Sequence, residues 1–91
     1  MKKINVYGKI YTIEYVDEVE DNEDGMIYKK EGLIHIAKSL KGDDRTSTEW
    51  HEITHALIYR LGHEENISDD AIELICEHFA VFLTEQGCKL K

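Results

Sequence analysis

The hydrophobic pattern of this 91-residue chain changes its period near Leu40, and this change limits the folds open to it. Residues 3–15 alternate between apolar and polar positions and are rich in Ile, Val, Tyr and Thr, with Gly8 near their centre. Such a pattern is typical of a β-hairpin. Residues 26–37 form a second alternating run with a turn near residues 30–32. The first half of the chain is therefore predicted to form antiparallel β-hairpins with three or four strands.

Beyond Leu40 the apolar residues recur at the spacing of an α-helix. Thr46 and Glu49 are spaced as a capping box, which predicts that a helix begins near them. This helix is expected to run to about Leu61, because Gly62 is a natural C-terminal stop.

A second helix is expected after Ser68, which is a good N-cap, and Gly87 should end it. The apolar positions between them form a helical stripe: Ile72, Ile75, Phe79, Phe82 and Leu83. We expect the first three of these side chains to be buried beside the first helix. Cys76, in the same run, is expected to fill the core. Strands followed by two helices predict a single α+β domain over residues 1–91.

The composition limits the classes of function. The chain has 19 acidic residues against 11 Lys and Arg, for a net charge of −8, which opposes nucleic-acid binding because phosphate contacts require Lys and Arg. No apolar run approaches the roughly 18 residues of a membrane span, and the start lacks the apolar core of a signal peptide. We therefore expect a cytoplasmic protein whose partner is a protein or peptide. The two cysteines are expected to be reduced thiols.

The segment 51-HEITH-55 places two histidines and a glutamate within about one helical turn. On a helix, His51 and His55 lie about 40° apart around the axis and about 6 Å apart along it, so both imidazoles can reach one ion. Glu52 lies about 100° from His51, close enough to act on a water beside the ion without ligating the ion. The motif predicts a zinc site with Glu52 as its general base.

A catalytic zinc site needs a third protein ligand and one open position. Glu73 and Glu77 are four residues apart on the second predicted helix, so both can face the first helix and either can complete the site. His78 lies about 140° from Glu73 and is expected to point elsewhere. His63 is a further alternative ligand, although an exposed histidine that interacts with the helix dipole explains it better.

Three segments resemble the small zinc metallopeptidases of the ImmA/IrrE-like group, in particular its short members from phages and mobile elements. They are 32-GLIHI-36, 51-HEITHAL-57 and the run from Glu73 to 79-FAVFL-83. The resemblance covers nearly the whole chain and implies a zincin-like domain of the gluzincin type. It also implies that the strand around residues 34–36 pairs with an extended substrate.

The resemblance further implies a role for each residue of the site. His51, His55 and Glu73 would ligate Zn²⁺, and Glu52 would be the catalytic base. Glu77 stands where related gluzincins have an Asn or Asp that orients a ligand histidine. A longer carboxylate could still accept the imidazole N–H, so Glu77 is expected in that supporting role or, alternatively, as the ligand in place of Glu73.

These features predict a zinc-dependent endopeptidase, and by the resemblance its substrate would be a regulatory protein such as a transcriptional repressor. The sequence leaves the oligomeric state open. The alternative is a non-catalytic module, in which zinc staples an acidic domain that acts by binding a protein partner. Glu52 favours the enzyme, because a structural zinc site has no use for a base beside an open position.

Overall fold

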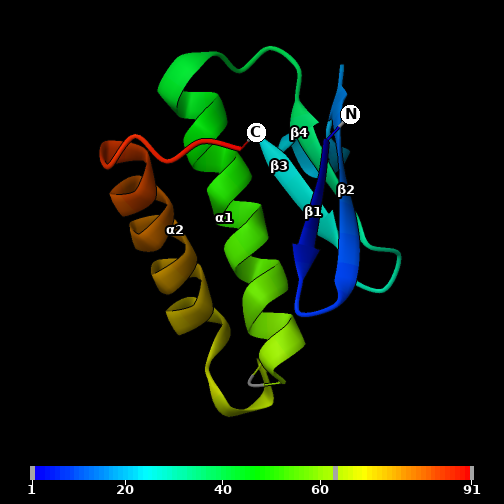
Figure 1. Ribbon diagram of the computed structural model, residues 1–91, viewed down its shortest axis with the longest axis vertical. Helices are drawn as coiled ribbons and strands as arrows, with labels where there is room; N and C mark the ends of the chain where they lie inside the picture. Colours follow the sequence, from blue (N-terminus) through cyan, green and yellow to red (C-terminus); the bar gives the residue numbers. More distant parts are fainter. Residues whose placement is uncertain (1, 63, 91) are drawn as a thin grey trace.

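Four strands precede two helices in the described part of the chain, which comprises residues 2–62 and 64–90 of this computed structural model (Figure 1). In chain order the elements are β1 (Lys2–Val6), β2 (Lys9–Val16), β3 (Gly25–Tyr28), β4 (Leu33–Ala37), α1 (Gly42–Leu61) and α2 (Asp69–Glu85). Short 3-10 turns occupy Glu20–Asn22 and Glu64–Asn66. The α+β class is confirmed. Neither α1 nor α2 is long and apolar enough to cross a membrane.

The first hairpin turns at Tyr7 and Gly8. Their φ angles are 49° and 86°, and positive φ at both central residues is the requirement of the two-residue turn that matches the twist of the flanking strands. Glycine adopts this conformation without steric cost, and its N–H donates to Asn5 Oδ1 at 2.8 Å. The hairpin predicted from residues 3–15 is therefore confirmed.

The sheet has the strand order β1-β2-β4-β3. Each predicted hairpin is antiparallel, but the two hairpins join through a parallel pairing of β2 with β4, which places Ile13 beside Ile34. The prediction of antiparallel pairing was therefore right within each hairpin and wrong for the sheet as a whole. It also follows that β4 is an interior strand. The expectation that residues 34–36 pair with a substrate was wrong, because the free edge on this side of the sheet belongs to β3.

The main core lies between one face of the sheet and α1. Ile34 and Ile36 are fully buried on this face, together with residues of β2, and they pack with Ile53 and Ala56 of α1. His35 projects from the opposite face, where its Nε2 lies 3.2 Å from a carboxylate oxygen of Glu14. The predicted alternation along this strand is therefore confirmed.

Helix α1 begins at Gly42, four residues before the predicted start. The hydroxyl of Thr46 donates to the carbonyl oxygen of Gly42, so Thr46 lies inside the helix. Glu49 is buried and accepts a hydrogen bond from the phenol of Tyr15. The predicted capping box was wrong, because its glutamate pairs with the sheet. The predicted C-terminus is correct, since the helix ends at Leu61 and the next residue is left-handed.

Helix α2 has the predicted N-cap, because Ser68 Oγ accepts from the Ala71 N–H at 3.2 Å. Its buried stripe differs from the prediction. Of the three side chains expected to be buried, Ile72 is buried, whereas Ile75 is 46% exposed and Phe79 is 43% exposed. The buried positions of α2 share a spacing of four residues: Ile72, Cys76 and Ala80.

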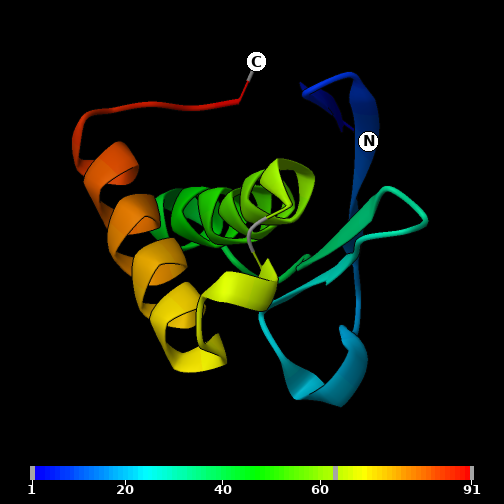
Figure 2. The same ribbon diagram turned by 90° about the horizontal axis from the view of Figure 1, so that it is seen from below.

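The arrangement of layers explains this narrow stripe. The sheet, α1 and α2 lie side by side in that order, so α2 packs mainly on α1 (Figures 1 and 2). A helix with one neighbour buries one narrow row of side chains. Cys76 and Ala80 are small, and they let the two helices approach closely. This close approach brings the glutamates of α2 within reach of α1.

Candidate metal centre

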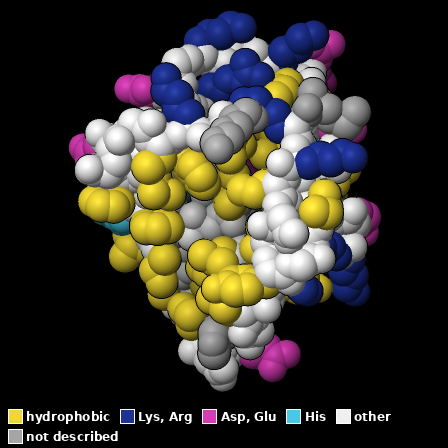
Figure 3. Space-filling model, viewed as in Figure 1, with side chains coloured by type: hydrophobic (Ala, Val, Ile, Leu, Met, Phe, Trp, Pro, Cys, Tyr) yellow, Lys and Arg dark blue, Asp and Glu magenta, His cyan; other side chains and the backbone are white. Residues whose placement is uncertain are grey.

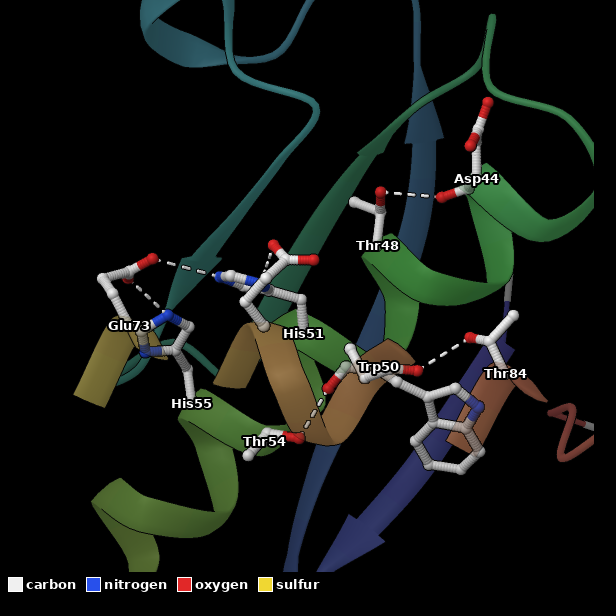
Figure 4. Close-up of polar contacts among 10 residues, drawn as sticks. Asp44, Thr48, Trp50, His51, Thr54, His55, Glu73 and Thr84 are labelled. Atoms are coloured by element: carbon white, nitrogen blue, oxygen red, sulfur yellow. Dashed lines mark hydrogen bonds and ion pairs between the residues drawn. The ribbon is translucent and has the colours of Figure 1, made fainter. Parts of the chain in front are cut away.

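His51 and His55 project from one face of α1, toward α2 and the edge strand β3 (Figure 4). Their ring centroids are 5.1 Å apart. Both side chains are mostly enclosed, with 17% and 13% of their surface exposed. The helix thus places the two imidazoles as the one-turn spacing predicts.

Glu73 of α2 contacts both histidines. Its Oε1 lies 2.7 Å from Nε2 of His55, and its Oε2 lies 3.3 Å from Nε2 of His51 (Figure 4). Its side chain is 60% exposed, so the carboxylate closes the group on the solvent side. The three residues predicted as zinc ligands therefore meet at one point.

Glu77 reaches only one of the histidines. Its Oε2 lies 3.3 Å from Nδ1 of His51, on the side of the ring opposite to the contact with Glu73. His78 is exposed and belongs to no such group. His63, the further alternative, lies outside the described residues. The sequence allowed either Glu73 or Glu77 as the third ligand. Only Glu73 contacts both histidines, as a third ligand of one ion must.

The donor atoms fit a zinc ion. One nitrogen each of His51 and His55 and one oxygen of Glu73 lie within 4.8 Å of one another. Zinc bonds of about 2.0–2.2 Å in a tetrahedron place ligand atoms about 3.3–3.6 Å apart, so small rotations of these side chains would suffice. Two imidazoles and one carboxylate are also a donor set that zinc accepts, and they leave a fourth position open.

Burial changes the pKa of His55, the histidine that Glu73 contacts most closely. Burial lowers the pKa of His55, and the nearby Glu73 carboxylate acts in the opposite direction without cancelling it. A metal binds the neutral imidazole, so a lowered pKa reduces competition from protons.

Glu52 lies beside the donor set and is 8% exposed. Burial raises its pKa to about 7, with the negative charges of Glu73 and Glu23 acting in the same direction and His51 acting against it. A carboxyl group with a pKa near neutrality can both accept and donate a proton. This property, in a group that lines the same cleft as His51 and Glu73, is typical of a catalytic acid–base residue.

The cleft has a volume of about 270 Å³ and lies between the start of β3 and the two helices. Gly25, the first residue of β3, forms part of its wall. A Cβ atom at Gly25 would lie 2.9 Å from Cγ2 of Thr48 and 3.1 Å from Cγ of Glu52. The absence of a side chain therefore lets the edge strand pass close to the predicted base. A role for Gly25 was not predicted from the sequence, although an isolated glycine at a strand often marks a close approach of the backbone.

No family model, curated protein or solved structure matches this chain. Fold and site together define an α+β domain with a candidate metal centre made of two histidines from one helix and a glutamate from the next.

Proposed function

We propose that this chain is a zinc-dependent metallopeptidase of the gluzincin type, as its resemblance to the ImmA/IrrE-like group implies. The observation that carries the proposal is the contact of Glu73 with both His51 and His55, with the buried Glu52 next to them and outside the donor set. A purely structural site would not need this fourth residue. The ion is zinc in this proposal, because two histidines four residues apart on a helix, a glutamate beside the first and a third carboxylate ligand are the pattern of hydrolytic zinc sites.

A bound zinc ion would polarise a peptide carbonyl and lower the pKa of water in its open position toward about 7. His51, His55 and Glu73 hold the ion. Glu52 accepts a proton from the attacking water on a carboxylate oxygen, and later donates it to the nitrogen of the leaving amine. In the metal-free protein burial raises the pKa of this carboxyl to about 7, and the positive charge of a bound ion would lower it.

Glu77 supports the site in this proposal. With Nε2 of His51 directed at the ion, Nδ1 would carry the proton and face the Glu77 carboxylate, whose Oε2 lies 3.3 Å from Nδ1. Such a contact selects the tautomer and the orientation of the ligand ring. Glutamate thus does here what the Asn or Asp of related gluzincins does.

An extended peptide is the proposed form of the substrate. β3 has β4 on one side only, and its first residue lies on the wall of the cleft. Its free edge offers backbone N–H and C=O groups to a peptide that would add a strand to the sheet. The peptide bond to be cleaved would then pass in front of Glu52 and the histidines.

The test is an incubation of the zinc-loaded protein with an unfolded protein such as reduced casein, followed by mass spectrometry of the fragments. Glu52→Gln should reduce the rate of cleavage at least about 100-fold while zinc content stays near one ion per chain. Glu65→Gln, at an exposed glutamate of the turn between the helices, is the matched control and should cleave at the normal rate. A normal rate in Glu52→Gln would remove Glu52 from the mechanism.

The second candidate is a zinc-stapled interaction module. It is favoured by the position of α2, which packs mainly on α1, so that an ion shared by the two helices would fasten α2 in place. One zinc ion per chain without cleavage of any unfolded protein or peptide mixture would favour this candidate over the peptidase.

A further inference from the structure

Helix α2 exposes five large apolar side chains, which we call the α2 apolar face: Leu74, Ile75, Phe79, Val81 and Phe82. Their exposed fractions run from 42% for Val81 to 61% for Leu74. Figure 3 shows hydrophobic side chains gathered in a column over α2 and continuing over the lower part of α1. Scattered apolar residues are ordinary on a protein surface, but a continuous patch of this kind marks a binding surface.

The α2 apolar face is arranged in two rows. Ile75, Phe79 and Phe82 follow the spacing i, i+4, i+7, and Leu74 and Val81 are seven residues apart on the neighbouring row. The rings of Phe79 and Phe82 lie nearly parallel, with centroids 6.4 Å apart and 13° between their planes. Side chains spaced in this way along about 12 Å of helix form the kind of surface onto which a second helix packs.

Carboxylates accompany the second row. Asp70 precedes Leu74 by four residues and Glu85 follows Val81 by four, whereas Glu77 contacts His51 in the candidate metal centre. Residues four apart are neighbours on a helix, so Asp70 and Glu85 lie next to the two ends of this row. α2 contains no Lys or Arg at all. Its surface therefore combines apolar side chains and carboxylates with one histidine, His78, which lies between the two rows.

We propose that the α2 apolar face binds an amphipathic helix of another protein, with apolar residues on one face and Lys or Arg along its flank. The basic flank would meet Asp70 and Glu85, which lie outside the candidate metal centre. A second copy of this chain fits less well, because α2 against α2 in either direction places carboxylates against carboxylates. Two copies would also bring together chains of net charge −8 each. Binding at this face requires neither a zinc ion nor peptidase activity.

The experiment uses two synthetic helical peptides with the same leucine stripe, one with Lys and one with Glu on the polar face. Binding is measured by fluorescence anisotropy with zinc present and with it chelated, at two salt concentrations. The Leu/Lys peptide should bind with micromolar affinity and more weakly at high salt, and the Leu/Glu peptide should bind at least tenfold more weakly. Equal binding of the two peptides, or binding of neither, would overturn the proposal.

Two variants locate the contact. Phe79→Ser combined with Phe82→Ser should weaken binding of the Leu/Lys peptide at least tenfold, and Asp70→Asn combined with Glu85→Gln should weaken it several-fold and reduce its salt dependence. Tyr7→Ser combined with Ile10→Ser removes equally exposed apolar side chains from the first hairpin and should bind normally. Equal losses in this control would show that the peptide binds unspecifically, against the proposal.

Analytical sedimentation of the chain alone tests whether a second copy covers the face. A monomer at micromolar concentration agrees with the proposal. A dimer that the Phe79→Ser and Phe82→Ser pair dissociates would show that a second copy covers the face, and would overturn the choice of a basic partner. The circular dichroism spectrum and melting temperature of the Phe79/Phe82 pair and of the Tyr7/Ile10 pair should match those of the unaltered protein, because the exchanged side chains are exposed.

Discussion

Glu73 and Glu77 lie on opposite sides of the His51 ring, one at each nitrogen. They should therefore contribute unequally to metal binding. Glu73→Ala would remove a proposed ligand and should lower zinc affinity by more than about 100-fold, whereas Glu77→Ala would remove only the proposed support of His51 and should lower it about 10- to 100-fold. Competition with a chromogenic chelator measures both affinities. The opposite order would make Glu77 the ligand and Glu73 its support.

Removal of the metal should destabilise the domain. An ion that binds the folded state only, present at about 1,000 times its dissociation constant, adds about 4 kcal/mol to the free energy of unfolding. For a domain of this size the melting temperature should then fall by more than about 10 °C on addition of a chelator. Calorimetry measures the shift, and His55→Ala is the control, because a variant without the site should not respond to the chelator.

The stability of the metal-free protein should depend on pH through Glu52. Its pKa is raised from 4.5 to about 7 in the folded state, so the folded state prefers the protonated carboxyl. The corresponding stabilisation is complete below about pH 4.5, declines as the pH rises, and is lost above about pH 7. Glu52→Gln cannot ionise and should avoid this loss.

In the presence of a chelator, Glu52→Gln should therefore be more stable than the unaltered protein at pH 8, by about 3 kcal/mol, and equally stable at pH 4. Urea unfolding at pH 4, 6 and 8 measures the difference. Glu65→Gln, at an exposed position, should show no such dependence. A difference between Glu52→Gln and the unaltered protein that stays constant with pH would place the pKa of Glu52 near its ordinary value.

A side chain at Gly25 should press β3 away from α1. Its Cβ would lie 2.9 Å from Cγ2 of Thr48, so Gly25→Ala should cost about 1–3 kcal/mol of stability. Thr48→Ser removes that methyl group and keeps the hydroxyl, which donates to the carbonyl oxygen of Asp44. The double variant should recover part of the loss in urea unfolding. No recovery would mean that the remaining close contact, with Cγ of Glu52 at 3.1 Å, carries the whole cost.

Features that depend on neighbours along the chain were predicted correctly. His51 and His55 share a face because any helix places residues four apart on one side. Ser68 caps α2 and the residue after Leu61 ends α1, since both effects arise within one turn of the helix. The third member of the centre required a choice between Glu73 and Glu77, which share a face of the same helix, and only the packing of the helices distinguishes them.

Features that depend on distant contacts were missed. The parallel pairing of β2 with β4 was not predicted, because alternation specifies which face of a strand is buried and not which strand lies beside it. Glu49 looked like part of a cap, but Tyr15, 34 positions earlier, binds it. Ile75 and Phe79 were expected to be buried because an apolar stripe on a helix gives no sign of how many elements will cover it.

The division of the apolar interior has a consequence for how the domain comes apart. One cluster joins the sheet to α1 and a second, smaller cluster joins α1 to α2. The candidate centre takes two of its donors from α1 and the third from α2, so it lies between the same two helices as the smaller cluster. An ion bound there would hold α2 against α1. The concentration of that ion would then determine the fraction of molecules in which α2 stays packed over the histidines.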